Sequence, residues 1–245
     1  MSISKPRMEN PAKKFIGFSG KNGQFTYYDK SGEKETWRNV EIQKPIYLIV
    51  LDELSAIKGY CKKTESGITS NEVHNITTDV LKVRTFKGGL EAVGKYKDIS
   101  DKVKIWGGKF TKSVYALLIT GKTQAELVNF QFKGASLNSW IDKKFNTEKF
   151  GVIIKNELQE GKNGDTIYKI PVFGSLNITP ELFDIAIKTD NEILQPYLRS
   201  YTATQMEKEI IPAGIIENEI YPDFEPETTT ETIINQVDDG GDLPF

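Results

Sequence analysis

The sequence has 245 residues, of which 38% are hydrophobic, and its 32 basic and 34 acidic side chains give a formal net charge of −2. This hydrophobic content is enough to fill a core without disulfide or metal support. The single cysteine, Cys61, and the single histidine, His74, exclude a disulfide framework within the monomer and a Cys/His zinc site, so we predict no metal and no cofactor.

Strand patterns dominate the chain from residue 15 to residue 175. Residues 1–14 are polar and rich in lysine and proline, and we expect a flexible basic arm there. Beyond them, β-branched and aromatic runs are separated by glycine-rich turns. Residues 78–86 alternate apolar and polar side chains only in part, and this pattern predicts that Leu81, Val83 and Thr85 point to one face and Val80, Lys82, Arg84 and Phe86 to the other. The predicted strands are 24–29, 46–61, 78–86, 113–120 and 126–132, followed by a hairpin of 150–158 and 165–173.

Two helices are predicted among and after these strands. Residues 135–145 have helical spacing of their apolar side chains, with Ser136 or Asn138 as the candidate cap. A longer helix is predicted over 180–203, where Thr179 is the N-cap, Pro180 occupies the first helical position, and Pro196 should bend or break the helix.

These elements predict a mainly β domain with two helices over residues 15–206. A partly open Greek-key barrel of the OB type, with long elaborations, fits this pattern best. A β-sandwich would give a similar number of strands and stays open as the alternative.

The charges are divided unevenly along the chain. Residues 207–245 carry eleven acidic side chains and one basic side chain, a net charge of −10, and the remaining 206 residues have 31 basic and 23 acidic side chains, a net charge of +8. The last 39 residues are also poor in apolar residues and rich in Pro, Thr and Gly, so we predict a disordered acidic tail. A basic body joined to an acidic tail indicates a polyanionic ligand for the body and a separate role for the tail.

Basic, aromatic and glycine residues are interleaved on the predicted strands and turns of the body. This combination is typical of single-strand binding, because cations contact the phosphates and flat rings stack on unpaired bases of any sequence. Strand aromatics also fill cores, so a core position is the alternative for each ring. The candidate nucleic-acid-binding residues are Lys58, Tyr60, Lys62, Arg84, Phe86, Lys87, Tyr96, Lys97, Trp106, Lys109, Phe110, Lys112 and Tyr115.

The last eight residues join an acidic run to a short apolar tip. Such a tip suits a pocket with apolar walls and a basic rim on a partner protein. The candidate partner-binding residues are Asp238, Asp239, Asp242, Leu243, Pro244 and Phe245. Here the chain resembles the bacterial and phage single-stranded DNA-binding proteins, and its longer body and acidic linker favour a diverged phage-encoded member.

The resemblance implies that the body coats exposed single-stranded DNA during replication, recombination and repair. It also implies that the tip recruits a polymerase, helicase or nuclease. An oligomer is possible. The runner-up functions are an annealing or recombination mediator, a viral structural β-protein, and a nuclease or polymerase accessory domain.

No catalytic pattern accompanies these signals, so we predict that the chain is not an enzyme. Residues 89–96 nearly match a phosphate-binding loop, but Tyr96 stands where a Ser or Thr hydroxyl must bind magnesium. The longest apolar runs are too short to cross a bilayer, and the first residues lack the apolar segment of a signal peptide. We therefore expect the protein in the cytoplasm, and in the host cytoplasm if it is phage-encoded.

Overall fold

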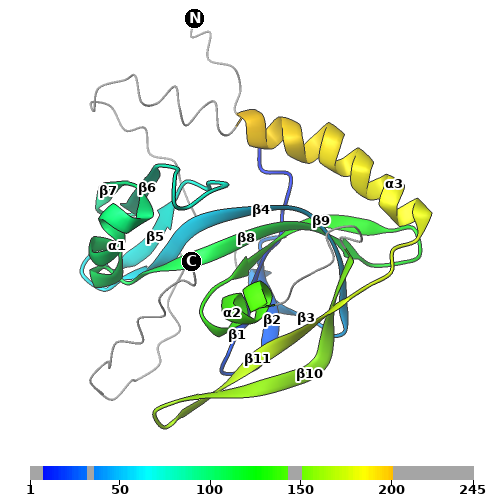
Figure 1. The fold of residues 1–245 in the computed structure, drawn as a ribbon, viewed down its shortest axis with the longest axis horizontal. Coiled ribbons are helices and arrows are strands. Elements are labelled where there is room, and N and C mark those ends of the chain that lie inside the picture. Colours follow the sequence, from blue (N-terminus) through cyan, green and yellow to red (C-terminus); the bar gives the residue numbers. More distant parts are fainter. Residues whose placement is uncertain (1–7, 32–35, 143–150, 201–245) are drawn as a thin grey trace, which may run out of the picture.

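The computed structural model describes residues 8–31, 36–142 and 151–200. The predicted acidic tail, its apolar tip and half of the predicted basic arm therefore lie outside the described residues. The described part is mainly β, as the sequence predicts (Figure 1). Its strands are β1 (Phe15–Ser19), β2 (Gln24–Asp29), β3 (Arg38–Ile42), β4 (Ile46–Cys61), β5 (Ser66–Ser70), β6 (Leu81–Thr85), β7 (Gly89–Gly94), β8 (Gly108–Ile119), β9 (Ala125–Phe132), β10 (Gly151–Asn163) and β11 (Thr166–Ser175). The helices are α1 (Tyr96–Ile105), α2 (Ala135–Asp142) and α3 (Pro180–Thr189), which continues into a π-helical turn (Asp190–Leu194).

All eleven strands belong to one open, mixed sheet in the order β3-β2-β1-β9-β8-β4-β5-β6-β7, with β10 pairing with β4 and β11 pairing with β10. The pair β1–β9 is parallel, and every other pair is antiparallel. β4 is the central strand because its 16 residues pair with β8 along one edge and with both β10 and β5 along the other. Its register to β8 shifts between Val50 and Asp52, and such a bulge bends a strand. The sheet therefore curls in one half and extends as a separate lobe in the other.

The curled half encloses an aromatic core. Strands β1, β2, β4, β8, β9, β10 and β11 contribute apolar side chains to it, and α2 adds Leu137 and Trp140. The Phe132 and Trp140 rings are stacked with their centroids 4.7 Å apart, and Phe173 meets the Trp140 ring edge-on. Helix α2 is thus held against the inner face of the curled sheet (Figure 1).

The extended lobe consists of β5, β6, β7, the last third of β4, the start of β8, and α1. One face of this part of the sheet packs against Ile99 and Val103 of α1 and forms a second core. The sheet residues in that core include Ile57, Cys61, Ile68, Leu81 and Val83. Because α1 covers this face, the opposite face of the lobe carries the polar side chains of the same strands.

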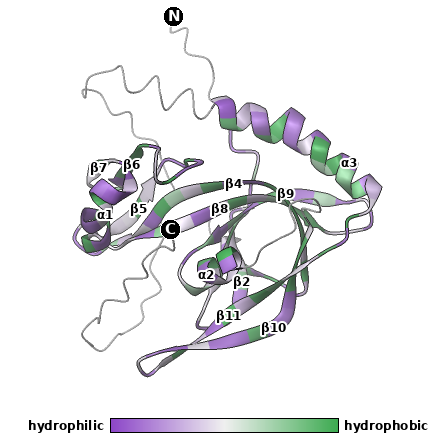
Figure 2. Cartoon of the chain, viewed as in Figure 1, coloured by the Kyte–Doolittle hydropathy of each residue, from purple (hydrophilic) through white to green (hydrophobic). Residues whose placement is uncertain are grey.

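Helix α3 begins as the sequence predicts. The Thr179 side chain accepts a hydrogen bond from the Leu182 N–H, and Pro180 follows at the first helical position. Pro196 does not break the helix. The Gln195 N–H donates to the Asp190 carbonyl, five residues back, and this π-turn directly precedes the proline, whose ring cannot fit behind a regular turn. Figure 2 shows the hydrophilic and hydrophobic bands that alternate along α3, as an amphipathic helix requires.

The main differences from the predicted elements are in the short strands and in α1. The sequence did not identify β1, β3, β5 or β7, although β1 pairs with the next strand in the chain, β2, and β3, β5 and β7 pair with the strands that precede them. Residues 95–97, predicted to lie among strands and turns, lead into α1 instead. No helix among the described residues is long and apolar enough to cross a membrane.

Candidate nucleic-acid interface

Four polar side chains form a row across the uncovered face of the lobe. Lys58 on β4 pairs with Lys109 on β8 and with Thr69 on β5, and Thr69 pairs with Arg84 on β6. Directly opposed residues in antiparallel strands have their side chains on the same face of the sheet. Three of the predicted cations therefore lie in one row across four strands, with Thr69 between Lys58 and Arg84, although Lys58 and Lys109 are 51 positions apart in the sequence.

Two predicted aromatic residues lie next to this row on the same face. Tyr60 pairs with Gly67, and the Phe86 N–H donates to the Gly67 carbonyl at 3.1 Å. A Cβ at Gly67 would lie 2.5 Å from the Phe86 ring. The ring can therefore lie this close over the strand only because residue 67 is a glycine. Phe86 remains 40% exposed and Tyr60 is half-buried. Both rings are accessible at the surface beside the cations.

Lys133 and Phe15 extend this surface, and the sequence did not identify either of them. Lys133 follows the last residue of β9, and Phe15 begins β1. The Lys58 Nζ lies 5.8 Å from the centroid of the Phe15 ring, which is within cation–π range, and Phe15 is 42% exposed. We call the surface formed by Phe15, Lys58, Tyr60, Arg84, Phe86, Lys109 and Lys133 the basic face.

The basic face contains a concentrated positive charge. Lys133 is an exposed residue overall, yet desolvation lowers the pKa of its ammonium group, and the like charges of Lys109 and Lys58 lower it further. No ion pair joins Lys58, Lys109 or Lys133 to a carboxylate of any residue that the structure describes. These three residues, the lysine triad, thus repel one another, and an anion bound among them relieves that repulsion.

The prediction that Tyr115 binds nucleic acid is wrong, because its side chain is fully buried. It lies on the part of the sheet that the C-terminal helical segment covers. It packs against Leu194 and Tyr197, and its hydroxyl donates to the Glu72 carboxylate at 2.8 Å. Burial, followed by the negative charge of Glu72, raises the pKa of this phenol. A base cannot reach the ring while this segment is in place.

Three further aromatic predictions belong to the opposite face of the lobe. Phe110 pairs with Ile57, whose side chain points into the second core, and the Phe110 ring lies 6.3 Å from that of Tyr96. Tyr96 and Trp106 also pack against this core from α1 and its C-cap. The core alternative therefore describes these rings better than base stacking on the basic face.

The remaining predicted lysines lie apart from the basic face or at its rim. Lys97 is exposed on α1, on the far side of the lobe. Lys112 pairs with Ser55 on the opposite face, where its Nζ lies 3.7 Å from the Glu53 carboxylate. Lys62 and Lys87 are exposed in turns near Ser66, which pairs with Cys61 and accepts a hydrogen bond from the Lys87 N–H.

The described residues contain no cluster of three or more His, Cys, Asp or Glu side chains that could bind a metal ion. Comparisons with protein-family models, with curated protein sequences and with solved structures found no match to this chain. The geometry and charge of the basic face are therefore the basis for assigning a function.

Proposed function

We propose that this protein binds single-stranded DNA on the basic face and acts without catalysing a reaction. The observation that carries this proposal is the lysine triad without carboxylate partners among the described residues, next to the accessible rings of Phe15, Tyr60 and Phe86. The ammonium groups suit the phosphates of a strand, and each ring offers a flat surface to a base.

The pairing of cations with exposed rings favours a single strand over a duplex. In a duplex the faces of the bases are stacked on one another, and only an unpaired base can lie flat on a side chain. Phosphate contacts alone would serve both ligands, because they carry no sequence information. The rings beside the triad are thus the feature expected to discriminate between the two.

The strands that enclose the first core support the second element of the proposal, an elaborated OB-type barrel. They curl around one apolar interior, with α2 held against their inner face. In OB folds the exposed surface of such a barrel binds oligonucleotides. The lobe of β5, β6, β7 and α1 would then be an elaboration that enlarges the binding surface.

The acidic residues 207–245 support a role in recruitment. Their net charge of −10 is opposite to that of the body, so this segment should compete weakly with DNA for the basic face and be displaced by a strand, which adds stacking. We propose that the displaced segment presents Leu243, Pro244 and Phe245 to replication and recombination proteins.

The experiment that tests the proposed function is a salt-dependent titration with single- and double-stranded oligonucleotides of about 30 nucleotides. Each phosphate contact contributes about 0.7 to the slope of log affinity against log salt for a single strand, so Lys58→Ala, Lys109→Ala and Lys133→Ala together should reduce the slope by about 2.

Lys97→Ala, Lys102→Ala and Lys104→Ala on α1 are the matched control, because they remove the same charge from the far side of the lobe. This triple substitution should leave the slope nearly unchanged. If both triple variants weaken binding equally, only the overall charge matters, and the basic face is not the interface.

A further inference from the structure

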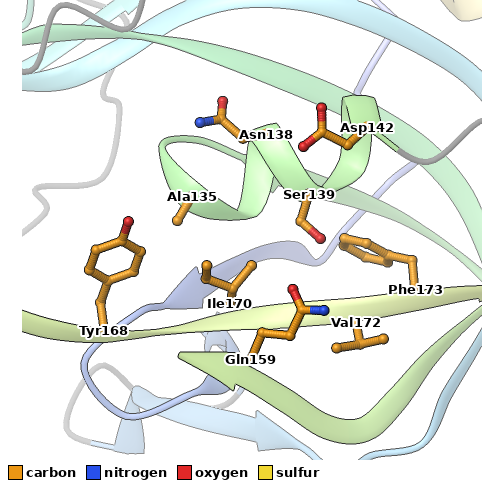
Figure 3. A pocket seen from close by; sticks show the side chains of 9 residues that line it. All are labelled: Ala135, Asn138, Ser139, Asp142, Gln159, Tyr168, Ile170, Val172 and Phe173. Atoms are coloured by element: carbon orange, nitrogen blue, oxygen red, sulfur yellow. The ribbon is translucent and has the colours of Figure 1, made fainter. Parts of the chain in front are cut away.

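A hollow of about 300 Å³ lies between α2 and the β10–β11 hairpin (Figure 3). Its helical wall is a single stripe of α2 with i, i+3, i+4, i+7 spacing: Ala135, Asn138, Ser139 and Asp142. On the hairpin, Gln159 pairs with Ile170, and Gly161 pairs with Tyr168, so the side chains of Gln159, Ile170 and Tyr168 share one face. Figure 3 shows Tyr168 and Ile170 rising from β11 toward α2, and Ser139 directed from α2 toward β11.

The Tyr168 ring forms one side of this hollow in a position that depends on a glycine. A Cβ at Gly161 would lie 2.4 Å from two atoms of the ring, so any side chain there would displace it. Ile170, Val172 and Phe173 add apolar surface beside the ring. The hollow thus combines an aromatic ring with an aliphatic wall, as a flat apolar ligand requires.

Polar groups line the hollow from α2 and, at Gln159, from β10. The Ser139 hydroxyl donates to the Pro171 carbonyl at 2.7 Å and fixes α2 against β11. The side-chain amides of Asn138 and Gln159 and the carboxylate of Asp142 make no hydrogen bond with any residue that the structure describes. Two amides and a carboxylate are therefore available for the polar edge of a ligand whose faces are apolar.

The helix that lines the hollow, α2, begins two residues after Lys133 of the lysine triad. Gly134 has φ +55°, a conformation that favours glycine, and it turns the chain from Lys133 into α2. Ala135, at the wall of the hollow, is thus only two residues from Lys133. A strand whose phosphate lies at the triad can therefore place a neighbouring base near the hollow.

We propose that the hollow holds one unstacked base of the DNA strand bound at the basic face, and that it selects a base with an exocyclic amino group. This inference rests on the proposed function. When ionised, the Asp142 carboxylate accepts hydrogen bonds and donates none. The amino groups of cytosine, adenine and guanine can donate a hydrogen bond to it. Thymine has a carbonyl oxygen in the corresponding position and has no such donor.

The test compares strands that differ at a single position. A 30-nucleotide oligo-dT and the same strand with one central dC are titrated against the full-length chain at fixed salt. The dC strand should bind about tenfold more tightly, the discrimination expected of a good side-chain contact to a base edge. Asp142→Asn should remove most of this preference, because its amide can donate to the thymine carbonyl.

Asp165→Asn is the matched control, because Asp165 lies in the turn of the same hairpin, outside the lining of the hollow, and its neutralisation changes the net charge equally. It should leave the preference for dC intact. Gly161→Ala should reduce the preference by displacing the Tyr168 ring, without changing the salt slope that the triad sets.

A photoreactive 5-iodo-dC at the central position gives a second readout that does not depend on affinity. Its crosslink, located by mass spectrometry, should fall on Tyr168. Equal affinities for the two strands, together with crosslinks only to Phe15, Tyr60 or Phe86, would overturn the inference and leave the proposed function standing. Failure of the protein to bind either strand would instead refute the proposed function itself.

Discussion

Substitutions at Tyr115 and Tyr60 test directly which aromatic residues of the sheet support the fold and which contact DNA. Both are tyrosines on long central strands, and Tyr→Phe removes one hydroxyl from each while keeping the ring. The Tyr115 hydroxyl donates to the Glu72 carboxylate at 2.8 Å and accepts from the Asn10 amide at 3.3 Å. We expect Tyr115→Phe to destabilise the fold without affecting DNA binding.

The expected size follows from these two contacts. A hydrogen bond to a charged group contributes about 1.5–3 kcal/mol, and Glu72 keeps the hydrogen bond from the Ser113 hydroxyl at 2.6 Å. We therefore expect a loss of about 2 kcal/mol in the free energy of unfolding. For a domain of this size that loss corresponds to a decrease of roughly 4–8 °C in the melting temperature.

Thermal unfolding and oligo-dT titration of the same preparations provide the assay. Tyr60→Phe is the control, because its ring remains on the basic face and its melting temperature and affinity should both stay near the values of the unmodified protein. If Tyr115→Phe weakens DNA binding while the melting temperature is unchanged, Tyr115 contacts the strand and its assignment to the core is wrong.

Phe86→Ala should weaken single-strand binding by roughly 1–3 kcal/mol with little change in melting temperature, because we propose that its exposed ring stacks on a base and the ring belongs to none of the cores of the described residues. Trp106→Ala should do the reverse and cost about 3 kcal/mol of stability, measured by denaturant unfolding, with affinity unchanged in the folded fraction. Lys133 loses its proton at a lower pH than an isolated lysine, because its pKa is lowered. The affinity for DNA should therefore decrease as the pH rises through that pKa. The free energy of unfolding should increase between this lowered pKa and the pKa of the unfolded chain, because the unfolded chain binds the proton more tightly. Lys133→Arg should abolish both effects. Replacing the eleven acidic residues of 207–245 with their amides should tighten DNA binding at low salt and have little effect at high salt, and unchanged affinity at low salt would show that this segment does not compete for the basic face.

The sequence alone determined the features that depend on local pattern. Alternation predicted that Leu81 and Val83 lie on one face of β6 and Lys82 and Arg84 on the other, and the burial of Leu81 and Val83 beside the half-buried Lys82 and Arg84 confirms it. The pair Thr179–Pro180 marked the start of α3, because capping needs only residues that are adjacent in the chain. The mainly β class followed in the same way from period-2 runs and turn residues.

Only the tertiary structure decided which residues form a common surface. Lys58, Lys109 and Arg84 lie in one row because of the register between β8, β4, β5 and β6, and register is a non-local property that a sequence pattern does not specify. The sequence pattern likewise does not specify whether Phe86 and Tyr115 are buried. Both are aromatic residues near lysines in strand-like sequence, yet Phe86 covers a glycine at the surface, whereas the distant segment at 194–198 covers Tyr115. Whether a ring stacks on a base or fills a core depends on what packs over it, and that contact comes from elsewhere in the chain.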